Sequence, residues 1–259
     1  MSPSGLQINK PVAVAIFGVI VTVSVVYYYS DTFGLTKTKN LAEPSTKTSR
    51  KNMEEKNIVV NVNGEDLKIF TRQVKPDKEP IFDILLLHGQ AFSSQNWMDI
   101  GTLDMLKKTG YRAVAVDLPG YGKSSKTEIK EKGEFIKDLI KTLEMNAPVI
   151  ISPSMSGSFA LPYIFNGEAS SVLKRARAYI PVAPVGTSEF KEKYPQSQIP
   201  TLIVRGENDL SLGTLSENNL KTIPRSEVHV IQDAGHACYI NKPDEFHNLI
   251  SIFLKSVQS

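Results

Sequence analysis

The sequence predicts an α/β domain with a mostly parallel β-sheet and helices on both of its faces. Short apolar runs alternate with stretches of helical periodicity from Asn57 to the C-terminus. Most of these runs are apolar nearly throughout, which indicates strands covered by helices on both sides. The chain has 259 residues, 41% of them hydrophobic, which is enough for one such domain of roughly 200 residues with additional segments.

The first two predicted strands form an antiparallel hairpin, which makes the predicted sheet mixed. Residues 58–62 and 67–74 flank Asn63-Gly64, and Asn-Gly supplies the positive φ angles of a tight type I′ turn. The later strands are predicted at 82–89, 111–120, 147–152, 176–185, 200–206 and 226–233. Helices are predicted at 94–108, 128–145, 212–222 and 243–257, with a further helix after Ser154.

Residues that could take part in nucleophilic catalysis follow three separate core strands. Ser154 comes after the strand 147–152, Asp209 after 200–206, and His236 after 226–233. Ligands of open α/β sheets bind at the carboxyl ends of the strands, where these three side chains would lie. A serine, an acid and a histidine in this chain order are typical of α/β-hydrolases. We therefore predict an α/β-hydrolase fold with a Ser-His-Asp triad.

Each predicted site residue answers a chemical need. A serine hydroxyl is a weak nucleophile until a base takes its proton, and His236 would be that base and later the acid for the leaving group. Asp209 would hold the tautomer of the imidazole and stabilise its charged form. The backbone N–H groups of Gln90 and Met155 would form the oxyanion hole, which stabilises the negative charge that develops on the substrate oxygen.

The turn around Ser154 departs from the G-x-S-x-G pattern of such enzymes. Ser152 and Ser156 stand where the two glycines are expected, within the stretch VIISPSMSGSFALPY. The turn needs small residues because the strand and the following helix pass close to each other. Serine exceeds alanine by only one oxygen, and Gly157 relieves crowding one position later, so we expect the turn to form.

Several simpler interpretations of these residues remain open at this point. A serine-rich segment is more often an ordinary turn or helix cap, and a histidine near the C-terminus is usually incidental. Glu207 is a rival to Asp209 as the triad acid, and Asp233 is a weaker rival because it precedes His236 by only three residues. Asp209 is preferred because it lies in the loop just beyond its strand.

The N-terminal region has a different character. Val12 to Tyr29 is free of charge, and its 18 residues would span about 27 Å as a helix, close to the thickness of a hydrocarbon core. We predict a short tail at 1–11, a transmembrane signal-anchor at 12–29, a flexible stalk at 30–55 and the hydrolase domain at 56–259. A cleaved signal peptide is the alternative, but its apolar region is normally shorter and no small-x-small cleavage site follows.

Charge and cysteine content exclude several other classes. The net charge of +3 is small, with lysines and arginines interleaved with acids, so nucleic acid is not an expected partner. The single cysteine, Cys238, excludes an intrachain disulfide framework and a cysteine-based zinc site. Lys37, Lys39 and Lys47 follow the predicted span and only Lys10 precedes it, so the positive-inside rule places the catalytic domain in the cytosol.

The segments that carry these residues resemble the α/β-hydrolase domain-containing protein 14 family, from Asn57 to the C-terminus. They are HGQAFSSQNWMDIGTLDMLKKTGYRAVAVDLPGYGKS, VIISPSMSGSFALPY, RGENDL and AGHACYINKPDEFH. The resemblance implies a triad of Ser154, Asp209 and His236, and the N-terminal segment resembles that of the family's membrane-anchored A form. The family's soluble B form hydrolyses small acyl esters and deacetylates lysine with coenzyme A as acyl acceptor, so the resemblance implies activities of this kind.

Only fourteen residues, 186–199, separate two of the predicted core strands, which leaves no room for a cap domain. An uncapped serine would accept a short acyl group on a bulky carrier. We therefore expect a membrane-anchored serine hydrolase or acyltransferase for small acyl-bearing substrates, with no metal or redox cofactor and with water or coenzyme A as acceptor. The alternative is a non-catalytic interaction module of the same fold at a membrane, with unknown protein partners.

Overall fold

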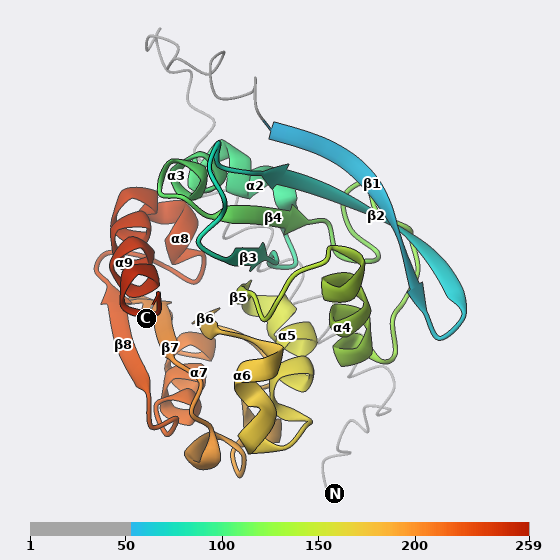
Figure 1. Ribbon diagram of the computed structural model, residues 1–259. Coiled ribbons are helices and arrows are strands. Elements are labelled where there is room, and N and C mark those ends of the chain that lie inside the picture. Colours follow the sequence, from blue (N-terminus) through green and yellow to red (C-terminus); the bar gives the residue numbers. More distant parts are fainter. Residues whose placement is uncertain (1–52, 259) are drawn as a thin grey trace, which may run out of the picture. The chain divides into compact units, whose positions relative to one another are not determined.

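The computed structural model describes residues 53–258, and these form an α/β domain built on one mixed sheet (Figure 1). The predicted tail, signal-anchor and most of the predicted stalk lie outside the described residues. Within 53–258, no helix is both long and apolar enough to cross a membrane.

The sheet has eight strands in the order β1-β2-β4-β3-β5-β6-β7-β8. The strands are β1 (Met53–Val62), β2 (Glu65–Val74), β3 (Asp83–Leu86), β4 (Arg112–Val116), β5 (Val149–Pro153), β6 (Ala178–Val182), β7 (Thr201–Gly206) and β8 (Ser226–Ile231). β2 pairs antiparallel with β1 and with β4, and every other pairing is parallel. The predicted mixed, mostly parallel sheet with an antiparallel hairpin at its edge is therefore confirmed.

Helices cover both faces of this sheet, as the apolar strands predict. The α-helices are α2 (Ser94–Asp99), α3 (Thr102–Lys108), α4 (Lys132–Thr142), α5 (Gly157–Phe165), α6 (Val172–Arg175), α7 (Leu212–Leu220), α8 (Cys238–Asn241) and α9 (Pro243–Ser256). Short 3₁₀ helices are η2 (Ser154–Ser156), η3 (Ala169–Ser171), η4 (Thr187–Phe190) and η5 (Tyr194–Gln196). Figure 1 shows α4 and α5 side by side, with α3 and α9 on the other side of the sheet.

Alternate residues of β3 supply two separate hydrophobic cores. Leu85 packs with side chains of α4 and α5. Ile84 and Leu86 lie in the second core, with side chains of α2, α3 and α9. All three are fully buried, which is the reason the strand reads as a continuous apolar run rather than an alternating one.

The structure corrects two predicted boundaries. The single helix expected over 94–108 is two helices, α2 and α3, because Gly101 adopts a left-handed φ of 80° between them. β1 begins at Met53, so residues 53–55 of the predicted stalk belong to the sheet. This extension is not evident from the sequence because the contact that stabilises it is polar. Arg72 of β2 donates a hydrogen bond to the Glu55 carboxylate across the hairpin at 3.0 Å.

The absence of a cap domain is confirmed for the connection between β6 and β7. Residues 183–200 contain only η4 and η5 as regular structure. This connection therefore adds no separate layer above the carboxyl ends of the strands.

Candidate active site

Ser154 lies at a sharp turn between β5 and α5. The strand ends at Pro153, and Ser154 has a φ of 49°, in the left-handed region that non-glycine residues rarely adopt. The 3₁₀ helix η2 begins at Ser154 and leads directly into α5. The Ser154 carbonyl accepts a hydrogen bond from the Val185 N–H at 3.0 Å, which holds the turn against the loop that follows β6.

The two serines that replace glycines in this turn are buried, and both hydroxyls have partners. The Ser152 hydroxyl lies 2.7 Å from the Tyr179 hydroxyl, inside the sheet. The Ser156 hydroxyl donates to the Pro153 carbonyl at 2.8 Å. Because a buried hydroxyl without a partner destabilises a fold, these two hydrogen bonds explain how serine is accommodated at both positions.

The close packing that requires a glycine occurs at Gly157, as the sequence predicts. A Cβ atom at this position would lie 2.5 Å from the Val185 carbonyl oxygen and 2.6 Å from the Pro184 Cβ. Real Cβ contacts are not that short, so α5 can approach the loop after β6 only with glycine at its first position.

The structure brings Ser154, His236 and Asp209 together. His236 Nε2 lies 2.8 Å from Ser154 Oγ, and His236 Nδ1 lies 2.5 Å from Asp209 Oδ2. Since an ionised carboxylate can only accept, Nδ1 carries a proton and donates it to Asp209. In the neutral imidazole, Nε2 then has its lone pair toward the Ser154 hydroxyl, which is the arrangement of a base in contact with its nucleophile.

Asp209 is held as a carboxylate by its surroundings, although only 4% of its side chain is exposed. Burial by itself would raise the pKa of Asp209. Hydrogen bonds from His236 and from the Gly213 N–H, together with the charges of His236 and Arg205, bring the pKa of this carboxyl below its ordinary value. Gly213 comes so near that a Cβ there would lie 2.8 Å from Asp209 Cγ.

Neither rival acid contacts the imidazole. Glu207 is exposed, and its carboxylate accepts the Asp233 N–H at 3.1 Å. Asp233 is also exposed and has a φ of 52° in the turn that precedes His236. Among residues 53–258 the acid bonded to His236 is therefore Asp209, the one that the loop position favoured.

The predicted oxyanion-hole residues lie on two segments beside Ser154. Met155 is the second residue of η2, and the N–H groups in the first turn of a helix lack an acceptor within it. Gln90 is exposed in the turn after β3, where the Phe92 N–H donates to the Gly89 carbonyl. A Cβ at Gly89 would lie 3.6 Å from the Ser154 Cβ, which brings this turn next to the serine.

His88 has a structural role that sequence reasoning missed. It is fully buried, and its Nε2 accepts the Leu118 N–H at 2.9 Å, so its proton lies on Nδ1, 2.8 Å from the Gly89 carbonyl. Burial lowers the pKa of His88, despite the hydrogen bond to Gly89 and the nearby Asp117 carboxylate. A neutral His88 thus links the turn that carries Gln90 to the loop after β4. In the sequence, this role is indicated only by a histidine directly before Gly89 at the end of a strand.

Two further conspicuous residues belong to the core. Trp97 is fully buried, and its indole N–H donates to the Leu87 carbonyl at 2.7 Å, so it anchors α2 and does not line an open pocket. Cys238 lies two residues from His236 and is also fully buried. Burial raises the pKa of the Cys238 thiol to about 12, which keeps it protonated and unreactive at neutral pH.

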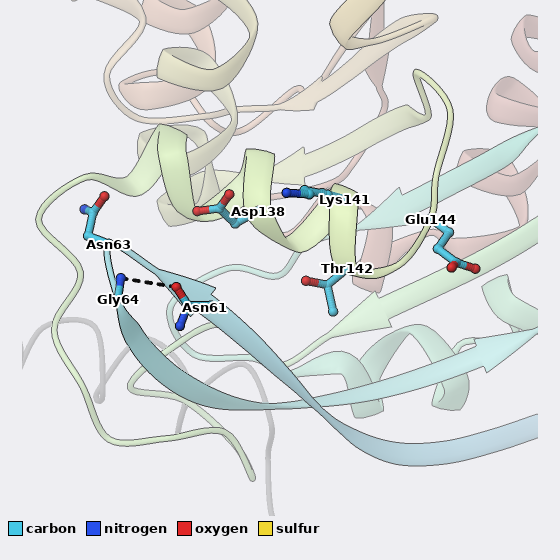
Figure 2. A pocket seen from close by; sticks show the side chains of 7 residues that line it. All are labelled: Asn61, Asn63, Gly64, Asp138, Lys141, Thr142 and Glu144. Atoms are coloured by element: carbon cyan, nitrogen blue, oxygen red, sulfur yellow. Dashed lines mark hydrogen bonds between the residues drawn. The ribbon is translucent and has the colours of Figure 1, made fainter.

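A polar cavity of about 540 Å³ lies elsewhere, between the tip of the β1-β2 hairpin and α4 (Figure 2). Asn61, Asn63 and Gly64 line it from the hairpin, and Asp138, Lys141, Thr142 and Glu144 from α4 and the residues after it. The lining holds no member of the Ser154 triad and no nucleophile paired with a base. Nor does any group of three or more histidine, cysteine, aspartate or glutamate residues within 53–258 have an arrangement that could hold a metal ion.

Comparison of the sequence with known proteins finds close relatives across the whole domain. The rat protein named "Putative protein-lysine deacylase ABHD14B" is 39% identical over 215 residues, which cover 80% of this chain and 99% of the relative. The zebrafish (Danio rerio) protein ABHD14A is 42% identical over 183 residues, covering 69% of this chain and 66% of the relative. No protein-family model matches the chain.

Comparison of the structure with solved structures gives the same fold. A hydrolase from Thermoplasma acidophilum, described as CIB-like, matches with a TM-score of 0.69 and 27% sequence identity. The match covers 79% of this chain and 100% of the other. A serine hydrolase of carbazole degradation, CarC, matches with a TM-score of 0.60 at 19% identity, which speaks for the fold alone.

The environment of Asp209 predicts a specific dependence of stability on pH. Its pKa is lower in the folded chain than the ordinary value of 3.8, so its ionisation stabilises the fold above that pH. This contribution is lost as the pH falls below about 4 through the folded-state pKa. We expect the free energy of unfolding to fall more steeply between pH 6 and pH 3 in the wild type than in Asp209→Asn.

Urea unfolding at several pH values measures this difference, with Asp77→Asn, at an exposed position, as the control. Wild-type and Asp209→Asn curves that run parallel down to pH 3 would mean that Asp209 is not held as a carboxylate by the fold. The control should follow the wild type.

Proposed function

This chain belongs to the ABHD14 family and is a serine hydrolase of the α/β-hydrolase superfamily, and on that premise we propose that its reaction proceeds through an acyl-enzyme on Ser154. The observation that carries the proposal is the continuous contact from Ser154 through His236 to Asp209, with donor–acceptor distances of 2.8 and 2.5 Å. The contact between Ser154 and His236 is within the range expected for a nucleophile and its base, and the contact between His236 and Asp209 is shorter still.

In the first half of the reaction, His236 removes the hydroxyl proton while Ser154 Oγ attacks the carbonyl carbon of the acyl donor. The charged imidazole is stabilised by Asp209, and it then protonates the leaving group as the bond to the acyl carbon breaks. In the second half, His236 takes a proton from the acceptor while the acceptor attacks the acyl carbon. His236 then returns this proton to Ser154 Oγ as the bond between the acyl carbon and the serine breaks, which releases the acylated acceptor. The lowered pKa of Asp209 supports its part in this sequence, because the residue is ionised at neutral pH.

The N–H groups of Gln90 and Met155 would stabilise the oxyanion of each tetrahedral intermediate. Their place on two segments beside Ser154 supports this assignment, since the two donors would approach the oxygen from different elements. Loss of one such donor typically slows the chemical step by about 10²–10³-fold. The bond between His88 and Leu118 would keep the turn that carries Gln90 in place between turnovers.

The proposed substrate is a small acyl group carried by a bulky molecule, as an ester or an amide. The uncapped connection between β6 and β7 supports this choice, because it leaves the serine accessible and provides no enclosed tunnel for a long lipid chain. The printed name of the rat relative assigns that protein to acyl groups on protein lysines, and an acylated lysine side chain fits the same description.

Water is the simplest acyl acceptor, and a thiol such as that of coenzyme A is the alternative that would make the chain an acyltransferase. Neither acceptor requires a metal or redox cofactor in the steps above. We further propose that the apolar segment 12–29 anchors the domain to a membrane as a signal-anchor, with the catalytic domain in the cytosol.

Fluorophosphonate labelling of the full-length chain tests the proposed nucleophile, because these reagents react with activated serines. We expect the wild type and Ser152→Ala to be labelled, and Ser154→Ala to lose the label completely. Ser152→Ala is the matched control, since it changes a buried serine of the same turn that contacts Tyr179 and not His236.

A folded wild-type chain that does not react would indicate that the triad is unused. The alternative function, a non-catalytic interaction module with this fold, would then be preferred.

The missing cap predicts a preference for short acyl chains. We expect acetyl and butyryl esters of one phenol to be turned over with a kcat/KM at least about tenfold above that of the palmitoyl ester, since a shallow site gains little from a long chain. Steady-state kinetics with the full-length chain measures the ratio. Rapid turnover of the palmitoyl ester with little activity on the short ones would mean that another element encloses the acyl chain.

A further inference from the structure

Lys132 places a positive charge beside the turn that presents Ser154. It is the first residue of α4, and its Nζ donates to the Ser158 hydroxyl on α5 at 3.1 Å. The Ser158 hydroxyl in turn donates to the Met155 carbonyl at 2.8 Å. Nζ also lies 5.0 Å from the centre of the Phe159 ring, which favours a cation over its face.

The position of Lys132 is fixed by close packing of the two helices. A Cβ at Gly133 would lie 3.1 Å from the backbone of Pro162 and of Tyr163, so the start of α4 comes as near to α5 as glycine allows. Figure 1 shows the two helices side by side. The first turn of α4, which carries Lys132, is therefore held against α5 by packing of the backbone and not by a flexible surface loop.

Among the residues that the structure describes, this ammonium has no carboxylate partner. No ion pair within 4.0 Å involves Lys132 among residues 53–258, whereas Lys137, on the same helix, pairs with Glu134 at 2.8 Å. Of its three N–H donors, one is used by Ser158. A cation at the first residue of its own helix is also disfavoured by the helix dipole, so the charge does not serve to stabilise α4.

The ammonium is within reach of an acyl group bound to Ser154. Because Ser158 Oγ lies 3.1 Å from Nζ and 2.8 Å from the Met155 carbonyl oxygen, Nζ is within about 6 Å of the backbone of the residue that follows Ser154. One further residue spans about 3.8 Å, so Nζ lies on the order of 9 Å from the nucleophile. The terminal carboxylate of a glutaryl group lies four C–C bonds, or roughly 5 Å, from the carbonyl carbon that the serine attacks. An ammonium–carboxylate contact of about 2.8 Å closes most of the remaining distance, and a succinyl group is one bond shorter.

We propose that Lys132 recognises a carboxylate at the far end of the acyl group, so that the enzyme prefers acyl groups derived from dicarboxylic acids of four or five carbons. This inference rests on the proposed function, because it specifies the substrate of the Ser154 site. The chemistry is the same acyl transfer: the bond from the acyl carbon to Ser154 Oγ forms, the bond to the leaving group breaks, and the distal carboxylate is unchanged. An apolar acyl group of equal length would displace water from the ammonium without replacing the hydrogen bonds of that water. Its binding is therefore disfavoured.

The test compares two acyl donors that differ only in the terminal group. The kcat/KM values of the full-length chain are measured for the glutaryl and pentanoyl esters of one phenol, after subtraction of the uncatalysed rates. We expect the wild type to prefer the glutaryl ester by at least about tenfold, in line with a charge-assisted hydrogen bond. Lys132→Met should abolish this preference by lowering the glutaryl rate alone, and Lys132→Arg should retain part of it.

Lys141→Met is the matched control, because Lys141 lies on the same helix but faces the polar cavity of Figure 2. It should leave the preference unchanged. The pentanoyl rate and fluorophosphonate labelling show in every variant whether the triad is assembled, so a folding defect at residue 132 cannot imitate the expected result.

Equal use of both esters by an active wild type, or an unchanged ratio in Lys132→Met, overturns the role of Lys132 and leaves the proposed function intact. If neither ester is turned over and the folded wild type is not labelled, both proposals are wrong.

Discussion

The arrangement of the site depends on the backbone at Ser154, which has a φ of 49° in a region that costs a non-glycine residue about 1–3 kcal/mol. This conformation directs the serine side chain out of the end of β5 and toward His236. It persists because its neighbours fix it: the Val185 N–H bonds the Ser154 carbonyl, and Gly157 lets α5 come against the same loop. The strain at Ser154 is therefore balanced by close packing of the turn and the start of α5 against the loop after β6, which is distant from them in the sequence.

The surroundings give different roles to two histidines near this turn, His88 and His236. His88 is buried and neutral, and it serves as a hydrogen-bond link between the loops after β3 and β4. His236 is partly exposed and faces an ionised Asp209, so it can gain a proton during the reaction. Because His88 is buried and has no hydrogen-bonded carboxylate, its role is structural. Because His236 contacts Asp209, it can act in proton transfer.

The sequence was sufficient to predict the fold class, the hairpin, and the three residues that meet at the strand ends. The fold class and the hairpin follow from local signals, the length of the apolar runs and the Asn63-Gly64 turn. The three site residues follow from their places after separate strands and from their order along the chain. The start of β1 was missed because it is held by a polar contact across the hairpin, between Arg72 and Glu55, that leaves no apolar pattern. The break between α2 and α3 was missed because a single glycine in a helical pattern is compatible with either outcome. The role of His88 depends on a partner thirty residues away and could not be read locally.

Direct detection of an acyl-enzyme tests most directly whether the reaction proceeds through Ser154. The full-length chain is mixed with an activated acetyl ester, quenched with acid within milliseconds to seconds, and analysed by mass spectrometry of its peptides. We expect an acetyl group on Ser154 that appears with the first product and disappears once the donor is exhausted. Product formation without an acylated Ser154 at any time, or stable acylation of a different residue, would contradict a mechanism that proceeds through this serine.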